Sequence, residues 1–261
     1  REWKRRKQLR LARNWGLFLA GCALVVFLLT KGILWLLPHL HGADGPQTFA
    51  ASAYDSTDYF FDADDARLVL VNANLPFDEE PSPTLDAADE AGTQLEAEAA
   101  QQYRSMAEAA QADGITLTLV TGYQDADTRT AAYEAQKQTY LARHKSEEEA
   151  SARAAAILPE ADANEHGTGY AADILSTDYT AQDTGFADTR AYQWLTAYAA
   201  EYGFILRYPK EAESVTGITY EPWHWRYVGP ENAALLNQSG LCLEDAIAVL
   251  QRIAAGETVT G

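Results

Sequence analysis

The sequence predicts an α+β domain, built on a small mixed antiparallel sheet with flanking helices and preceded by one transmembrane helix. Strand-like and helix-like segments follow one another without a regular βαβ rhythm, which favours α+β over doubly wound α/β. Residues 14–30 carry no charge, and the apolar run resumes after Lys31 as far as Leu37. Such a run can cross a hydrocarbon core of about 30 Å.

The N-terminal end also indicates a direction of insertion. Residues 1–13 form a basic stub with seven Lys and Arg, which places this side in the cytoplasm. We therefore expect a single-pass protein of the cell membrane, anchored through residues 14–38, with its catalytic domain extracellular. The alternative is a cleaved signal peptide, but its apolar region usually spans only about 7–15 residues.

The exported part is strongly acidic. The whole chain of 261 residues has a formal net charge of −18, and from residue 32 onward 12 Lys and Arg stand against 37 Asp and Glu. This balance excludes a nucleic-acid partner, which would require a basic face. Cys22 lies in the apolar run and Cys242 far along the chain, so no disulfide framework is expected.

Residues 39–66 are expected to form a tether, because they include a stretch of small and polar residues at 42–58. The apolar segment 67–72 predicts a short strand, and three prolines follow it. Residues 85–112 are rich in Ala, Glu and Gln with apolar residues at helical spacing, and Gly114 ends this predicted helix. Residues 115–121 alternate as a strand does.

The rest of the domain, which we bound at residues 67–255, mixes both element types. Helices are expected at 127–144 and 146–158, where Pro159 ends the second. A loop leads to a strand at 170–176, and Gly203 ends a helix at 188–202. Strands at 204–208 and 220–228 and helices at 231–238 and 243–255 complete the domain, and residues 256–261 form a tail.

Two clusters contain residues suited to chemistry. His166 opens the segment HGTGYAAD, which ends at Asp173. Strand alternation puts Asp173 on the same face as two apolar neighbours, so its carboxylate points inward, where it needs an ionic partner or a metal. In the second cluster, YEPWHWRYVG, strict alternation would separate Glu221 from His224. Pro222 weakens that objection, because a strand starts after a proline or bulges there.

Two imidazoles and one carboxylate, from His166, His224 and Asp173, form a donor set suited to one zinc ion with a fourth position left for water. Glu221 would then be the general base in an attack by that water on a peptide bond. The competing interpretation is a paired core Asp, a half-buried His and a surface Glu. Spacing alone does not decide between the two.

The sequence resembles the zinc D-Ala-D-Ala carboxypeptidases of the VanY type. The resemblance covers roughly residues 68–246, and its strongest blocks are EHGTGYAAD (165–173) and YGFILRYP to TGITYEPWHWRYVG (202–229). It implies zinc bound by the three residues above, Glu221 as base, and the fold shared with the Hedgehog signalling domain. It also implies a membrane-anchored exported enzyme that removes the terminal D-Ala from peptidoglycan stem peptides or their precursors.

Two departures from the family pattern concern expected substrate-binding residues. Gln124 stands where the family has Arg, and an uncharged amide stabilises an anion less well. Arg207 or Arg129 could compensate. Asn164 replaces a family Ser and can still form hydrogen bonds, and Tyr123 keeps its family place in the pocket.

Other functions remain open at this point. A DD-dipeptidase or a peptidoglycan endopeptidase of the same fold would use the same residues. A catalytically weakened, zinc-containing wall-binding module is the non-enzymatic alternative, for which Gln124 is the best support. Glu221 opposes it, because a structural zinc site has no use for a base.

Overall fold

The computed structural model describes residues 65–254, with side chains as far as residue 248. The expected stub, the anchor at 14–38, nearly all of the tether and the tail at 256–261 lie outside the described residues. Among residues 65–254, no helix combines the length and the apolar character that a membrane span requires.

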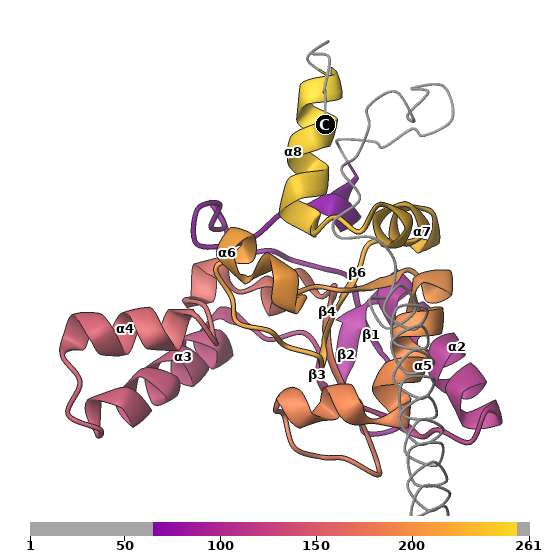
Figure 1. The fold of residues 1–261 in the computed structure, drawn as a ribbon, viewed down its shortest axis with the longest axis horizontal. Coiled ribbons are helices and arrows are strands. Elements are labelled where there is room, and N and C mark those ends of the chain that lie inside the picture. Colours follow the sequence, from indigo (N-terminus) through magenta and orange to yellow (C-terminus); the bar gives the residue numbers. More distant parts are fainter. Residues whose placement is uncertain (1–64, 255–261) are drawn as a thin grey trace, which may run out of the picture. The chain divides into compact units, whose positions relative to one another are not determined.

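A four-stranded antiparallel sheet forms the centre of the domain (Figure 1). Its strands are β3 (Leu117–Thr121), β4 (Ala171–Ser176), β5 (Phe204–Leu206) and β6 (His224–Tyr227), in the order β3-β4-β6-β5. A separate two-stranded hairpin precedes it in the chain. The expected α+β class with small antiparallel sheets and flanking helices is confirmed.

Seven α-helices surround this sheet within the described residues. They are α2 (Ala97–Ala112), α3 (Ala126–Leu141), α4 (Glu147–Ala155), α5 (Arg190–Tyr198), α6 (Glu213–Thr216), α7 (Pro230–Ser239) and α8 (Leu243–Ala254). Asp125 and Ser146 cap the N-termini of α3 and α4, where their side chains accept backbone N–H groups. Figure 1 shows these two helices as a hairpin on the side of the sheet away from α2 and α5.

Two apolar clusters stabilise the domain. The larger one joins α2 and α5 to the sheet, and Met106, Leu195, Trp225 and Tyr227 are all at most 2% exposed in it. The smaller one contains residues of β5, α7 and α8 together with Leu68. Burying this apolar area supplies most of the driving force for folding, at roughly 25 cal/mol per Å².

The strand expected at residues 67–72 is wrong. The structure has a short 3₁₀ turn at Ala66–Leu68, where the side chain of Asp65 accepts the backbone N–H of Arg67. No strand of the sheet pairs with this segment. The carbonyls of Arg67 and Val69 instead accept hydrogen bonds from Nη2 of Arg226, which an apolar pattern in the sequence does not reveal.

The helix expected at residues 85–112 begins later than its composition suggested. Its first part folds as a hairpin of β1 (Leu85–Ala87) and β2 (Gln94–Glu96). In the connecting turn, Asp89 accepts the backbone N–H of Thr93, and Gly92 adopts a φ of 84° that favours glycine. This turn folds residues 85–96 back on themselves as a hairpin, so the helix starts only at Ala97.

Candidate metal centre

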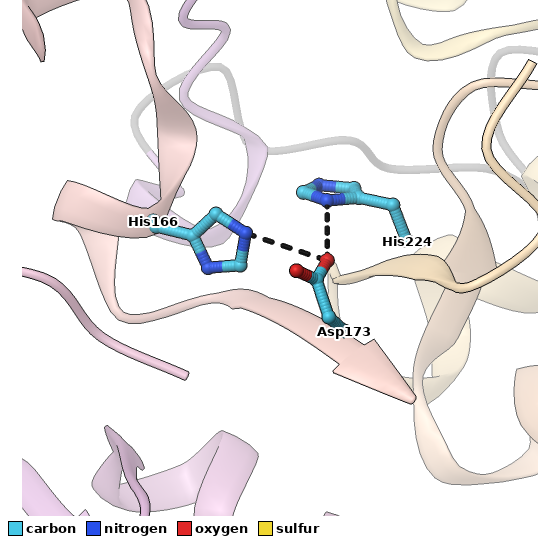
Figure 2. Close-up of side chains that lie close together, drawn as sticks. All are labelled: His166, Asp173 and His224. Carbon is cyan, nitrogen blue, oxygen red and sulfur yellow. Dashed lines mark hydrogen bonds and ion pairs between the residues drawn. The ribbon is translucent and has the colours of Figure 1, made fainter. Parts of the chain in front are cut away.

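Three buried side chains from separate segments converge beside the central sheet (Figure 2). His166 lies in a 3₁₀ turn at Glu165–Thr168, Asp173 in β4, and His224 is the first residue of β6. Oδ1 of Asp173 lies 3.4 Å from Nε2 of His166 and 2.9 Å from Nδ1 of His224. One possible ligand atom from each residue lies within 4.8 Å of the others.

Local structure explains how the sequence brings these residues together. The pairing of β4 with β6 aligns Asp173 with His224, although 51 positions separate them in the chain. Oδ1 of Asn164 accepts the backbone N–H of His166 and starts the turn. Gly169 ends it with a φ of 75°, a backbone conformation that glycine adopts readily.

The ring of His166 is oriented from the end of β3. Its Nδ1 lies 2.7 Å from the carbonyl oxygen of Gly122, to which it donates when Nε2 carries the lone pair. Only glycine fits at position 122, because a Cβ there would lie 2.2 Å from the carbonyl oxygen of Gln94. A close approach of β2 thus positions the carbonyl that holds His166.

The other two members of the cluster have side-chain partners that the sequence did not predict. Gln182 donates from Nε2 to Oδ2 of Asp173 at 2.9 Å, and Oε1 of Glu165 lies 2.9 Å from Nε2 of His224. Gln182 lies in a polar loop without any sequence signal. Glu165 is adjacent to His166 within the EHGTGYAAD block, and that position was its only signal.

The charges of the cluster act strongly on one another. Burial alone would raise the pKa of Asp173, but the two histidines outweigh burial and hold that pKa below its usual range. Burial alone would lower the pKa of His224, yet hydrogen bonds to Asp173 and Glu165 raise it to about 10. The centre is therefore arranged to receive positive charge.

Glu221 lies beside the cluster. Its Oε2 is 3.8 Å from Nδ1 of His224, and the residue is only 5% exposed. The backbone turns at residues 221–223, and β6 starts at His224, so alternation does not separate the two residues. Burial raises the pKa of Glu221 to about 8, against the opposing charge of His224.

The donor set fits a zinc ion. It offers two imidazole nitrogens and a carboxylate oxygen that lie close together, from three residues that are each at most 6% exposed and are oriented by outer partners. A buried carboxylate between two imidazoles is costly without a compensating charge. These three ligands leave a position open for water, as in catalytic zinc sites, whereas structural sites have four protein ligands.

Three expected substrate-binding residues lie around His166. Asn164 is 2% exposed, and its Nδ2 has no hydrogen-bond partner within the described residues. Gln124 is half-buried and donates its backbone N–H to the carbonyl of His166 at 3.2 Å. Tyr123 is also half-buried, and its backbone N–H donates to the carbonyl of Gln94 at 2.7 Å.

Neither candidate for the compensating arginine has a free guanidinium in this structure. Arg207 is 1% exposed, and its donors are occupied by Glu165 and Glu244. Arg129 is fully buried, pairs with Glu80 at 2.8 Å and also donates to two backbone carbonyls. Both arginines hold the structure around the centre, and contact with a substrate would require these pairs to break.

Comparisons with known proteins agree with this geometry. A family model described as "VanY: D-alanyl-D-alanine carboxypeptidase" matches residues 92–230. A D-alanyl-D-alanine carboxypeptidase of Enterococcus faecalis is 30% identical over 178 residues, which are 68% of this chain and 64% of that protein. The Bacillus subtilis protein YodJ, which is named as a carboxypeptidase, is 34% identical over 196 residues, which are 71% of this chain and 68% of that protein.

Solved structures show the same fold. VanYB in complex with D-alanine-D-alanine superposes with a TM-score of 0.64 and 28% identity, over 70% of this chain and 97% of that one. A mutant of the vancomycin resistance D,D-pentapeptidase VanY in complex with Zn(II) has a TM-score of 0.62 and 28% identity, over 69% of this chain and 98% of that one.

Proposed function

Because the chain belongs to the VanY family of D-alanyl-D-alanine carboxypeptidases, we propose that it is a zinc metallopeptidase that removes the terminal D-Ala from peptidoglycan stem peptides. The observation that carries this proposal is the convergence of His166, Asp173 and His224, with the buried carboxyl of Glu221 beside them. Hydrolysis adds water across the last peptide bond and releases D-Ala with a free amine.

His166, Asp173 and His224 would hold the metal, through Nε2, Oδ1 and Nδ1 respectively. A bound zinc ion would supply a Lewis acid that polarises the scissile carbonyl and acidifies the attacking water. The protein contributes a fixed donor set, because each of the three side chains is held by an outer hydrogen bond. The set is also mostly shielded from water, because each of the three residues is at most 6% exposed.

Glu221 performs the proton transfer in this proposal. Its carboxylate accepts the proton of the attacking water at Oε2 and delivers it to the nitrogen of the leaving D-Ala. Burial raises the pKa of Glu221 toward neutral pH, and this suits both steps. A carboxyl whose pKa lies near the working pH accepts and returns a proton readily. A module that only binds cell wall would gain nothing from burying this acid beside the cluster, so we favour the enzyme.

The terminal carboxylate of the substrate needs hydrogen-bond donors near the centre. Nδ2 of Asn164 is buried and unpaired within the described residues, and such a donor costs roughly 1–3 kcal/mol unless a partner arrives. A substrate oxygen would satisfy it. Gln124, whose backbone N–H donates to the carbonyl of His166, would supply an uncharged amide in place of the family Arg.

Product analysis tests the activity directly. We expect the zinc-loaded full chain, purified in detergent, to release single D-Ala from a stem pentapeptide that ends in D-Ala-D-Ala, as measured by mass spectrometry. Release of the dipeptide would instead identify a DD-dipeptidase, and cleavage of cross-linked peptides an endopeptidase. A folded protein that binds one zinc ion and yields none of these products would overturn the proposed activity.

We further propose that the chain is anchored in the cell membrane through residues 14–38, with its N-terminus in the cytoplasm and the catalytic domain outside. The uncharged run and the seven preceding Lys and Arg support this orientation. In cell fractionation, the protein should sediment with membranes. Protease added to intact spheroplasts should degrade the domain, whereas a protected domain or a soluble protein would contradict the proposal.

A further inference from the structure

Glu165, which precedes His166 in the chain, is in contact with three basic side chains. Glu165 is 1% exposed. Its Oε1 lies 2.9 Å from Nε2 of His224, and its Oε2 accepts hydrogen bonds from Nε of Arg207 and Nη1 of Arg226, each at 3.0 Å. Each of its carboxylate oxygens is thus engaged by at least one basic side chain.

The two arginines are themselves fixed by other parts of the domain. Arg207 donates from Nη1 and Nη2 to both carboxylate oxygens of Glu244 in α8, at 2.9 and 2.7 Å. Arg226 donates from Nη2 to the carbonyls of Arg67 and Val69, at 3.1 and 2.9 Å. The Glu165 carboxylate is thus held in one orientation by groups from β6, α8 and the start of the domain.

This arrangement selects one form of the His224 ring. A neutral imidazole has one N–H and one lone pair, and the partner of one nitrogen decides which form is present. A carboxylate that already accepts hydrogen bonds from two guanidinium groups can only accept from the ring as well, so Nε2 of His224 donates its hydrogen to Oε1 of Glu165. Nδ1 faces Oδ1 of Asp173 and the proposed metal position, so it is the nitrogen that would give up its hydrogen and offer a lone pair when a metal binds.

We propose that Glu165, held by Arg207 and Arg226, is a positioning residue that fixes the tautomer and the orientation of His224 for metal binding. The inference rests on the proposed zinc site. It gives a role to three buried charged side chains that take no part in the reaction itself. It also explains why Arg207 is not free for a substrate. Losing an outer partner of a metal-ligating histidine typically lowers metal affinity about 10–100-fold.

The main test is the zinc affinity of the Glu165→Gln variant of the full chain, measured by competition with a chromophoric chelator. We expect a 10–100-fold weaker affinity. Glu80→Gln is the matched control, because Glu80 also pairs with a fully buried arginine but contacts neither histidine. It should bind zinc within about 3-fold of the parent chain, well below the cost of losing an outer partner. Neither measurement involves a peptide, so failure of the proposed activity would not affect the result.

A spectroscopic measurement on the zinc-loaded parent chain covers the case in which Glu165→Gln does not fold. With ¹⁵N-labelled histidine, NMR should show a hydrogen on Nε2 of His224 and none on Nδ1. Glu165→Asp, which keeps the charge but shortens the side chain, should fold and show a smaller loss of affinity. Zinc on Nε2, or an unchanged affinity in a folded Glu165→Gln variant, would overturn the proposal.

Discussion

Replacing Glu221 by Gln is expected to lower kcat for D-Ala release by about 10²–10⁴-fold while zinc content stays at one ion per chain. The amide has nearly the same shape as the carboxyl but cannot accept the proton of the attacking water. The residue is 5% exposed, and burial already opposes its ionisation, so the amide should not weaken the fold. Stopped assays with the pentapeptide and metal analysis of the same sample measure both quantities.

The pH profile provides a second signature of Glu221. Its pKa is raised to about 8 by burial, and the charge of a bound zinc ion would bring it down again. At a pH below the pKa that Glu221 has with zinc bound, the carboxyl is neutral and cannot act as a base. We therefore expect kcat/KM to fall as the pH decreases. The residual activity of Glu221→Gln should lack this acidic limb.

The matched control for this variant is Glu211→Gln, which removes an exposed carboxylate ten residues earlier in the chain. Its kcat should stay within about 2-fold of the parent value, because an exposed side chain away from the cluster contributes little. A folded, zinc-containing Glu221→Gln variant that keeps more than a tenth of the parent kcat would show that another group is the base.

Replacing Asp173 by Ala is expected to abolish both activity and tight zinc binding. The residue supplies the only carboxylate of the donor set, and both histidines lie within 3.4 Å of its Oδ1. The loss of zinc affinity should exceed the roughly 10–100-fold cost of losing an outer partner, because a direct ligand is removed. Isothermal titration of the metal-free chain with zinc measures the affinity.

The parent chain should respond to metal removal in the same direction. After treatment with a chelator, activity should vanish and the melting temperature should fall, and added zinc should restore both. A ligand at 1,000 times its Kd stabilises the folded state by about 4 kcal/mol. Asp178→Ala, which removes an exposed acid just beyond β4, should behave as the parent does. Retention of full activity in a zinc-free sample would contradict a metallopeptidase.

Much of the architecture was predictable from neighbouring residues alone. Alternation at 115–121 and the short segment 170–176 identified β3 and β4, and helical patterns with stops at Pro159 and Gly203 located most helices after residue 126 within a few positions. Such signals are local, because a cap or a strand pattern depends on residues a few positions apart. The same kind of signal failed at 67–72 and 85–96, where the bonding partners of the backbone decided the outcome.

The sequence by itself determined the residue types of the candidate centre. Two histidines, an aspartate and a glutamate, in blocks that resemble a zinc peptidase family, were sufficient to name His166, Asp173, His224 and Glu221. Only the tertiary structure decided what surrounds them. The partners of Glu165 lie 42, 59 and 61 positions away in the chain, and the register of antiparallel strands brings them together. Ion pairs at such separations leave no periodic trace in a sequence, because they depend on which strands become neighbours.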